Sequence, residues 1–345
     1  MFSIMKRYRR TILIGMGVIL LIYAVIVPAM IFWPQVPLSA IGQTASDADL
    51  VASGIRIEAV YESEQAQFTM RDGTILAARY FPGESQQIIL MLHGVTGNSR
   101  LFNEPAGMIR DATNASIYAL DLRGHGESGG VRGSVDYVGQ YEDDLADTIT
   151  AIRTMHPDHD LIVLGYSMGG AIALRHAAQN NETVDGYVLL APNLGQDAPT
   201  ANAGEAPEPP PGVEPFFSLH IPRIIGLAMY EQLGIRAFSE QPVMFFNLPD
   251  PFVNTYSYSA MMNSTPSDYR AAFEAIDQPL LVIVGREDET MMADAFPAML
   301  DDIAPNSELR IVSGENHGSI RYSVAFVDAV KTWLNTVEPI TGLAQ

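Results

Sequence analysis

The chain has 345 residues, a length that suits one large α/β domain with an insertion. It contains no cysteine, which excludes disulfides, cysteine nucleophiles and thiolate metal sites. The formal net charge is −20, and such an acidic surface repels nucleic acid and anionic lipid headgroups, so we expect no nucleic-acid partner.

The N-terminus is basic, with Lys6, Arg7, Arg9 and Arg10. The run 11–33 that follows contains no charged residue. Because a bilayer core needs about 20 apolar residues, we predict a transmembrane anchor at 11–33 after a cytoplasmic N-terminus at 1–10. Cationic flanks stay in the cytoplasm, which places the rest of the chain on the outer, periplasmic or extracellular, side of a single-pass membrane protein. A cleaved signal peptide is the alternative, although its apolar region is shorter, about 7–15 residues. Residues 34–57 form a polar spacer.

From residue 58 onward, short apolar runs alternate with helical patterns. A hairpin is indicated by Asp72-Gly73 between strands at 67–70 and 74–81. Further strands are predicted at 87–92, 116–121, 161–166, 186–191, 280–284 and 308–312. Helices are predicted at about 100–112, 137–155, 168–180, 291–303 and 319–336. Strands that are almost entirely apolar predict a mostly parallel sheet with helices on both faces.

The alternation stops after Asn193, which divides the domain. We assign 58–193 and 278–337 to the core and 194–277 to an inserted lid, because long loops inside compact domains are usually functional. Its first part, Ala198–Pro215, is rich in proline and should be irregular. Two apolar stretches follow, Phe216–Tyr230 and Tyr256–Met262. Their aromatic and methionine side chains suit either an acyl pocket or the lid's own core.

A serine motif lies between a predicted strand and a predicted helix. Residues 165–169 read Gly-Tyr-Ser-Met-Gly, the G-x-S-x-G pattern of a nucleophile elbow. Glycine on both sides of the turn lets the strand and helix backbones pass close together. We therefore predict that Ser167 is a nucleophile. The alternative is a strand-to-helix turn that uses small residues only for packing.

A serine nucleophile needs a base, and the base needs an orienting carboxylate. His317, in a glycine-flanked loop after the strand 308–312, is the predicted base. The other histidine downstream of the serine, His220, lies in the insertion. Asp288, just after the strand 280–284, is the predicted acid. Glu287 is the second candidate for the acid, and Glu289 is expected in a solvated acidic turn.

Two backbone N–H groups are predicted to form an oxyanion hole. One belongs to Met168, directly after the nucleophile. The other belongs to Val95, in the loop that follows the strand 87–92. Gly94 would let this loop approach the serine, and we expect His93 to shape the loop rather than act as a second base.

Together these motifs resemble the α/β-hydrolase superfamily, and within it the monoacylglycerol lipase and lysophospholipase-like group with its serine aminopeptidase-type members. The resemblance is carried by His93-Gly94, Asp121–Gly129, Gly165–Gly170, Gly285–Asp288 and Asn316–Gly318. It implies the α/β-hydrolase fold with an eight-stranded, mostly parallel sheet and no metal or cofactor. It also implies that Asp121, Arg123 and His125 brace a loop.

Together with the anchor predicted at 11–33, the same resemblance implies a membrane-anchored serine hydrolase. Its substrates would be small carboxylic esters or lipids with apolar acyl chains, such as monoacylglycerol or lysophospholipid, cleaved through an acyl-enzyme beside the bilayer. A peptidase of the aminopeptidase type, a thioesterase or an acyltransferase on the same triad are alternatives. A non-catalytic binding module with this fold is another. The insertion matches no member of the group, which leaves the substrate open.

Overall fold

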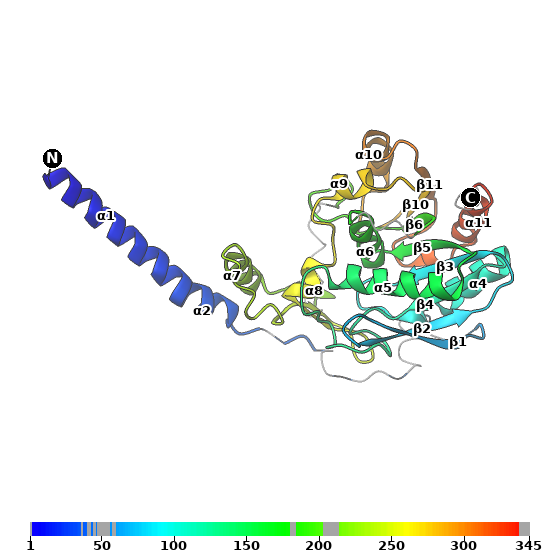
Figure 1. The fold of residues 1–345 in the computed structure, drawn as a ribbon, viewed down its shortest axis with the longest axis horizontal. Helices are drawn as coiled ribbons and strands as arrows, with labels where there is room; N and C mark the ends of the chain where they lie inside the picture. Colours follow the sequence, from blue (N-terminus) through cyan, green and yellow to red (C-terminus); the bar gives the residue numbers. More distant parts are fainter. Residues whose placement is uncertain are drawn as a thin grey trace.

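The structure is a computed structural model that describes residues 2–35, 37–39, 43, 46, 56, 60–179, 184–202 and 214–337. Most of the predicted spacer 34–57, and residues 203–213 of the proline-rich segment, lie outside the described residues. A long N-terminal helix projects from an α/β body, which carries the insertion on the side nearest this helix (Figure 1).

An eight-stranded sheet in the order β1-β2-β4-β3-β5-β6-β10-β11 forms the centre of the body. Its strands are β1 (Glu64–Thr69), β2 (Ile75–Phe81), β3 (Gln87–Leu92), β4 (Ser116–Leu120), β5 (Asp160–Tyr166), β6 (Gly186–Leu190), β10 (Leu280–Gly285) and β11 (Glu308–Val312). β2 runs antiparallel to both β1 and β4, and all other neighbours are parallel. The central strands are buried along almost their whole length. The predicted mostly parallel sheet is therefore confirmed.

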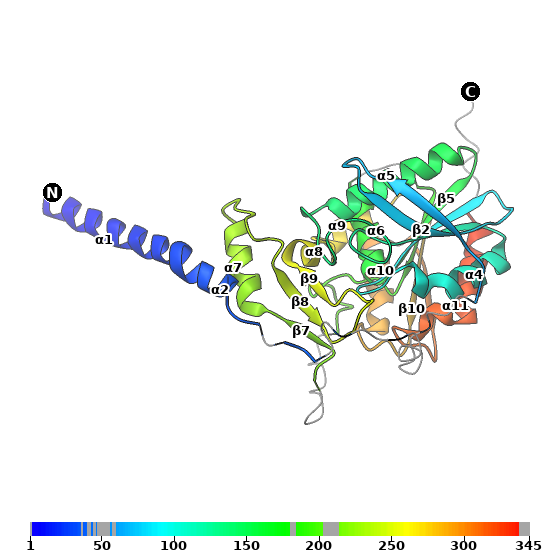
Figure 2. The ribbon, with the colours of Figure 1, turned by 90° about the horizontal axis from the view of Figure 1, so that it is seen from below.

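Helices cover both faces of this sheet. They are α4 (Asn103–Thr113), α5 (Gln140–Met155), α6 (Met168–Ala177), α10 (Phe296–Ile303) and α11 (Val324–Leu334). α4 packs with α11 on one face, and α5 packs with α6 on the other, where α9 (Tyr269–Glu274) and α10 extend the layer (Figure 2). The two-sided cover explains why the central strands are apolar on both faces.

Four predicted helices begin later than the sequence pattern indicates: α5 begins at Gln140, and the other three follow short 3-10 turns. Short 3-10 turns occupy Ser99–Phe102, Ala293–Ala295 and Ser319–Tyr322 ahead of α4, α10 and α11. The predicted helix 319–336 is therefore wrong at its start. Ser323 has an extended backbone, and its side chain accepts a hydrogen bond from the Phe326 N–H, so it caps a helix that begins only at Val324.

The insertion folds into its own small sheet and helices. Its strands β7 (Phe217–Leu219), β8 (Pro242–Phe246) and β9 (Thr255–Ser257) form an antiparallel sheet in that order. Helix α7 (Ile221–Glu231) connects β7 to β8, and α8 (Tyr258–Met262) follows β9. None of these strands appears among the predicted elements. β7 and β9 have only three residues each, too few for a strand pattern, whereas β8 has five, as many as β4, and was missed all the same.

The N-terminal helix begins earlier than the predicted anchor and ends two residues before its predicted end. It consists of α1 (Phe2–Leu21), a π-helical turn (Ile22–Ile26) and α2 (Val27–Ile31). Pro28 lacks an N–H and would clash with the preceding turn, which accounts for the widened π turn just before it. The stretch Thr11–Ile31 is long and apolar enough to cross a membrane, but an N-terminal signal sequence meets the same criteria.

The end of this helix packs against α7 of the insertion. Val27 and Ile31 are fully buried there, in a cluster with Leu227, Val243 and Tyr258. The Arg223 guanidinium donates hydrogen bonds to the carbonyl oxygens of Ile31 and Trp33, which lie at the C-terminal end of α2 and lack partners within the helix. We call this contact the α2–α7 joint.

Candidate active site

Ser167 lies at the sharp turn between β5 and α6. Its backbone has φ 52° and ψ −114°, a strained conformation for a residue with a side chain. The turn is tight because a Cβ on Gly169 would lie 2.3 Å from the Leu92 carbonyl oxygen, and one on Gly165 would lie 2.4 Å from the Gly169 carbonyl oxygen. The chain therefore places Ser167 at the carboxyl end of the central strand, as the motif predicts.

The structure brings the predicted base and acid to this serine. His317 Nε2 lies 3.1 Å from Ser167 Oγ, and His317 Nδ1 lies 2.8 Å from Asp288 Oδ2. The carboxylate can only accept a hydrogen bond, so Nδ1 carries the proton and Nε2 is free to accept the serine proton. The three residues come from the carboxyl ends of β5, β10 and β11, which meet at one edge of the sheet.

The carboxyl group of Asp288 is ionised in this environment. Burial opposes its ionisation, but hydrogen bonds from His317 and Thr290 and the electrostatic attraction of the His317 ring lower its pKa below the usual value. Asp288 Oδ1 also accepts hydrogen bonds from the backbone N–H groups of Thr290 and Met291. An ionised, fixed carboxylate is what a neutral imidazole needs in order to gain a proton.

Thr290 also belongs to this site, although it is not among the residues predicted from the sequence. Its hydroxyl oxygen lies 2.8 Å from Asp288 Oδ1 and 3.0 Å from His317 Nδ1, so it contacts both the acid and the base. The spacing offers a signal, because an aspartate often accepts hydrogen bonds from the residue two positions later. Thr290 limits the freedom of both side chains.

Asp288 lies in the loop 286–289 after β10, which we call the acid loop. The other two carboxylates of this loop hold the loop 313–318, which carries His317. Glu287 accepts a hydrogen bond from the Gly314 N–H at 2.7 Å, so this second candidate for the acid is engaged elsewhere. Glu289 is exposed, as expected for a solvated acidic turn, and it also accepts a hydrogen bond from the His317 backbone N–H at 3.2 Å. The Tyr166 hydroxyl donates to the His317 carbonyl oxygen at 2.9 Å. His317 is thus held through its backbone as well as its ring.

Two N–H groups beside Ser167 are free to bind an oxyanion. The loop after β3 approaches the serine so closely that a Cβ on Gly94 would lie 3.1 Å from Ser167 Cβ. In the part of the chain that the structure describes, neither the Val95 nor the Met168 N–H has a hydrogen-bond acceptor. Met168 opens α6, where the first N–H groups have no partner within the helix. Both predicted donors are therefore available.

His93 and His125 are buried and shape the surrounding loops. Burial lowers the pKa of His93 to about 4 and that of His125 to about 3, so both rings are neutral. His93 Nδ1 lies 2.8 Å from the Gly94 carbonyl oxygen, and its Nε2 accepts the Leu122 N–H. These contacts match the expected structural role. His220 lies away from the serine, at the α2–α7 joint, where its Nε2 contacts the Trp33 carbonyl oxygen.

Asp121 and Arg123 brace the loop after β4, as the resemblance implies. Asp121 accepts the backbone N–H groups of Ser99 and Glu127. Arg123 pairs with Asp144 of α5 through two hydrogen bonds of 2.6 and 2.8 Å, and both side chains are buried. Among the described residues, no group of three or more His, Asp or Glu side chains could hold a metal ion.

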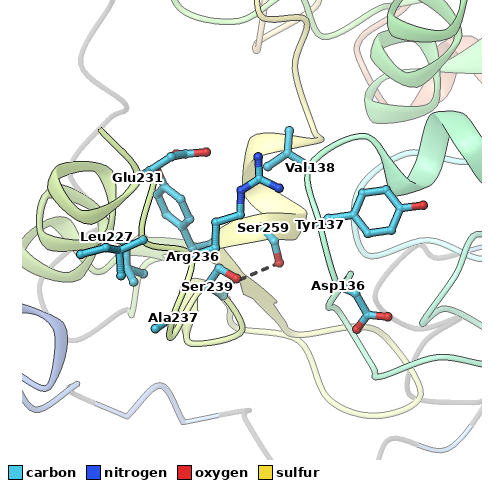
Figure 3. Close-up of a pocket in the computed structure, with 11 residues that line it drawn as sticks. Asp136, Tyr137, Val138, Leu227, Glu231, Arg236, Ala237, Ser239 and Ser259 are labelled. Atoms are coloured by element: carbon cyan, nitrogen blue, oxygen red, sulfur yellow. Dashed lines mark hydrogen bonds between the residues drawn. The ribbon is translucent and has the colours of Figure 1, made fainter. Parts of the chain in front are cut away.

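Two cavities lie at the insertion, and neither has Ser167 or His317 in its lining. The larger, about 450 Å³, lies at the α2–α7 joint. The smaller lies between α7 and residues 136–138 of the core, beside Arg236 (Figure 3). Its volume of about 20 Å³ holds one water molecule and no acyl chain. The aromatic side chains of the insertion were expected either to line an acyl pocket or to form the insertion's own core. Tyr256 and Tyr258 are buried in packing contacts, as in the second case.

Comparison with known proteins agrees with this fold. The family model described as serine aminopeptidase, S33, matches residues 83–321. The chain is 27% identical over 244 residues to the monoacylglycerol lipase of Mycolicibacterium smegmatis, a match that covers 67% of this chain and 80% of that protein. It is 32% identical over 123 residues to the monoglyceride lipase of Mus musculus, and this match spans only 40% of the mouse protein and 35% of this chain.

Solved structures show the same architecture. The monoacylglycerol lipase of Paleococcus ferrophilus has a TM-score of 0.51 at 18% identity, with 81% of this chain and 100% of that chain covered. An esterase from Pyrococcus furiosus has a TM-score of 0.54 at 18% identity, with 88% and 99% covered. At this identity the likeness concerns the fold alone.

The sheet order, the strand–serine–helix turn and the structural matches define an α/β hydrolase. Because the family model covers most of the chain, the protein belongs to the serine aminopeptidase, S33, family, with monoglyceride lipases among its relatives. The predicted resemblance and the predicted class of enzyme, a serine ester hydrolase, are confirmed.

Proposed function

We propose that this protein is a membrane-anchored hydrolase that cleaves carboxylic esters with apolar acyl chains, and that Ser167, His317 and Asp288 form its catalytic triad. The observation that carries the proposal is the continuous chain of hydrogen bonds from Ser167 through His317 to Asp288, beside two N–H groups that have no acceptor among the residues the structure describes. This arrangement can remove the proton from the serine hydroxyl. The adjacent N–H groups can stabilise the negative charge that then develops on the substrate oxygen.

The reaction follows from these positions. Ser167 Oγ attacks the ester carbonyl carbon while His317 Nε2 takes the hydroxyl proton. The negative oxygen of the tetrahedral intermediate accepts hydrogen bonds from the Val95 and Met168 N–H groups. His317 then gives the proton to the leaving alcohol, and the acyl group stays on Ser167. A water molecule, deprotonated by His317, releases the acid and restores the serine. Asp288 stabilises the imidazolium in both halves of the cycle.

Monoacylglycerols and lysophospholipids are the proposed substrates. The relatives named monoglyceride or monoacylglycerol lipase support this class. Amphiphiles of this kind concentrate in bilayers, beside which the proposed anchor would hold the enzyme.

The family description names an aminopeptidase, which is the main alternative activity. Such an enzyme needs a carboxylate near the nucleophile to hold the amine of the substrate. The three carboxylates of the acid loop are already engaged: Asp288 with the His317 ring, Glu287 with Gly314, and Glu289 with the His317 backbone. The acidic residues of the insertion are further candidates for this contact, and a peptide substrate assayed beside the ester series separates the two activities.

Two observations support the membrane placement. The first is the apolar stretch Thr11–Ile31, of mean hydropathy 2.7, which is almost entirely unburied by the rest of the chain. The second is the insertion, whose segment 216–238 exposes large apolar side chains next to the α2–α7 joint: Phe216, Phe217, Leu219, Ile221, Ile225, Leu233, Ile235 and Phe238. Exposed apolar area gathered in one segment is typical of a surface that meets a membrane or a partner.

The activity is tested with the full chain in detergent micelles and p-nitrophenyl esters from acetate to palmitate. We expect turnover and labelling by a fluorophosphonate in the wild type, and loss of both in Ser167→Ala. The matched control is Ser307→Ala, which removes a hydroxyl bonded only to the Ala304 carbonyl oxygen and should leave turnover unchanged. Equal rates in wild type and Ser167→Ala would overturn the esterase proposal.

The orientation is tested by single cysteines, since the chain has none of its own. In intact cells, a membrane-impermeant maleimide should label Ser307→Cys in the body and should reach Ser3→Cys only after permeabilisation. The reverse pattern would place the body in the cytoplasm. A mature protein whose mass lacks the N-terminal segment would instead identify a cleaved signal peptide.

A further inference from the structure

One side chain of the insertion reaches the loop that carries the proposed oxyanion hole. Tyr256, on β9, is fully buried, and its hydroxyl oxygen accepts a hydrogen bond from the Thr96 N–H at 2.5 Å. The same oxygen lies 2.7 Å from His125 Nε2. A residue of the insertion thus joins the loop after β3 to the loop after β4.

The donors and acceptors of this network have one consistent arrangement. His125 Nδ1 lies 2.9 Å from the Arg123 carbonyl oxygen, which can only accept, so Nδ1 carries the proton of the neutral ring. His125 Nε2 is then an acceptor, and the Tyr256 O–H donates to it. The lone pairs of the Tyr256 oxygen receive the Thr96 N–H. None of these groups can exchange its donor role for an acceptor role, or the reverse, without leaving a buried polar atom unpaired.

The network borders the peptide that would bind the oxyanion. The carbonyl oxygen of Gly94 accepts hydrogen bonds from His93 Nδ1 at 2.8 Å and from the Gly97 N–H at 3.2 Å. In a trans peptide the N–H points away from the carbonyl, so these bonds also fix the direction of the Val95 N–H. On the other side of Val95, Thr96 has φ 63°, a conformation that a β-branched residue rarely adopts.

We propose that Tyr256 is a positioning residue for the oxyanion hole: its hydroxyl holds the strained Thr96 backbone and thereby the direction of the Val95 N–H. The inference rests on the proposed function, because it assigns that N–H to the oxyanion. It makes one part of the insertion a structural component of the catalytic site.

The segment that carries Tyr256 is suited to this role because it is tied to the core. The Ser257 N–H donates to the Gly133 carbonyl oxygen at 2.9 Å, and the Ser259 hydroxyl donates to the Val135 carbonyl oxygen at 2.6 Å. Asn263 Oδ1 accepts the Gly139 N–H at 2.7 Å. β9 and α8 therefore move with the core, and a hydroxyl fixed on them can hold a backbone group in place.

The test compares Tyr256→Phe with Tyr258→Phe in the full chain. Both remove one hydroxyl from a buried tyrosine of the insertion. The Tyr258 hydroxyl, however, donates to Glu231 and does not contact the loop after β3. For Tyr256→Phe we expect kcat on p-nitrophenyl butyrate to fall about 10- to 100-fold, with KM within about twofold, since oxyanion donors act mainly in the transition state. Tyr258→Phe should keep the wild-type kcat.

A second readout separates positioning from a general loss of structure. A trifluoromethyl ketone forms a tetrahedral adduct with the serine, and its affinity should fall by about the same factor as kcat/KM in Tyr256→Phe. Binding of the fatty acid product, and the fraction of enzyme finally titrated by a fluorophosphonate, should not change. If Tyr256→Phe does not fold, His125→Phe, which removes the acceptor of the Tyr256 hydroxyl, should show the same pattern.

The outcomes distinguish this inference from the proposed function. If the wild type neither turns over esters nor reacts with the fluorophosphonate, the proposed function is wrong. If the wild type is active and Ser167→Ala is not, an unchanged kcat and ketone affinity in Tyr256→Phe would overturn the positioning role alone. A fall in titratable enzyme without a fall in kcat per active site would also overturn it.

Discussion

At the scale of single residues, the site depends on protons that are held in defined places. His317 has its Nδ1 proton directed at Asp288, and its Nε2 faces the serine hydroxyl. Thr290 contacts the same Nδ1 and the same carboxylate from a second direction. Glu289 adds a contact to the His317 backbone N–H, so the imidazole is oriented through both its ring and its backbone.

The role of Thr290 is tested by Thr290→Val, which keeps the side-chain shape and removes the hydroxyl. We expect kcat to fall about 10-fold with KM unchanged, because a lost hydrogen bond to a charged group costs about 1.5 kcal/mol. The pH profile of kcat/KM should also shift, since Asp288 loses one donor. Thr290→Ser should restore both readouts. A profile and a kcat equal to those of the wild type would show that Asp288 alone orients the ring.

His176 predicts a measurable pH dependence of stability. Burial of this side chain of α6 lowers its pKa to about 4 from the usual value of 6.5, so the folded ring stays neutral while the unfolded ring gains a proton. Between pH 6.5 and 4, the free energy of unfolding should therefore fall as the pH falls, by up to about 1.4 kcal/mol per pH unit for this histidine. His93 and His125 contribute with the same sign.

The measurement is urea unfolding of the full chain in detergent at several pH values. His176→Leu should show a shallower loss of stability than the wild type over this range. The buried carboxylates Glu142 and Asp144, whose pKa values are raised by burial, titrate alike in both proteins and cancel from the comparison. Parallel curves for the two proteins would contradict the neutral assignment of His176.

Ser167, Asp288 and His317 were predictable because each follows an apolar strand and carries a local signature. The ends of parallel strands meet at one edge of a sheet, so strand order alone brings the three residues together. Tyr256 carries no such signature. Its contact with Thr96 depends on how the insertion folds back onto the core, which no local pattern encodes.

At the scale of elements, the strand-to-helix turn is the most constrained part of the fold. Gly169→Ala would bring a Cβ within 2.3 Å of a backbone oxygen of β3, and backbone cannot move aside as a side chain can. We expect a loss of stability of about 3 kcal/mol or more, and loss of activity with it. Thermal unfolding measures the change. Gly17→Ala, with no atom within 4 Å of its added Cβ, is the control and should be neutral.

The composition and length of an element determine whether it could be predicted from the sequence. The strands of the core are long apolar runs, and their burial on both faces matches that composition. The 3-10 turns before α4, α10 and α11 were missed, because the hydrophobic pattern continues through them and only capping residues such as Ser323 mark the change. Of the strands of the insertion, β7 and β9 have three residues each and are too short to have a pattern of their own.

At the scale of the whole molecule, the net charge of −20 should affect the choice of substrate. A neutral monoacylglycerol should be cleaved with a higher kcat/KM than an anionic lysophospholipid of the same acyl chain, because the negative field opposes the approach of the anion. The preference should shrink between about 10 mM and 500 mM salt, as screening shortens the range of the field from about 30 Å to under 10 Å. A preference independent of salt would point to local contacts with the headgroup.

The α2–α7 joint has a kinetic consequence if the apolar helix spans a bilayer as we propose. Arg223 and the buried pair Val27 and Ile31 attach the body to the end of that helix, so the body cannot rotate freely about it. The enzyme would then search for substrate in two dimensions, among the lipids of its own leaflet. Its rate would follow the mole fraction of ester in that leaflet, and dilution with inert lipid would slow turnover even when the bulk concentration stayed constant.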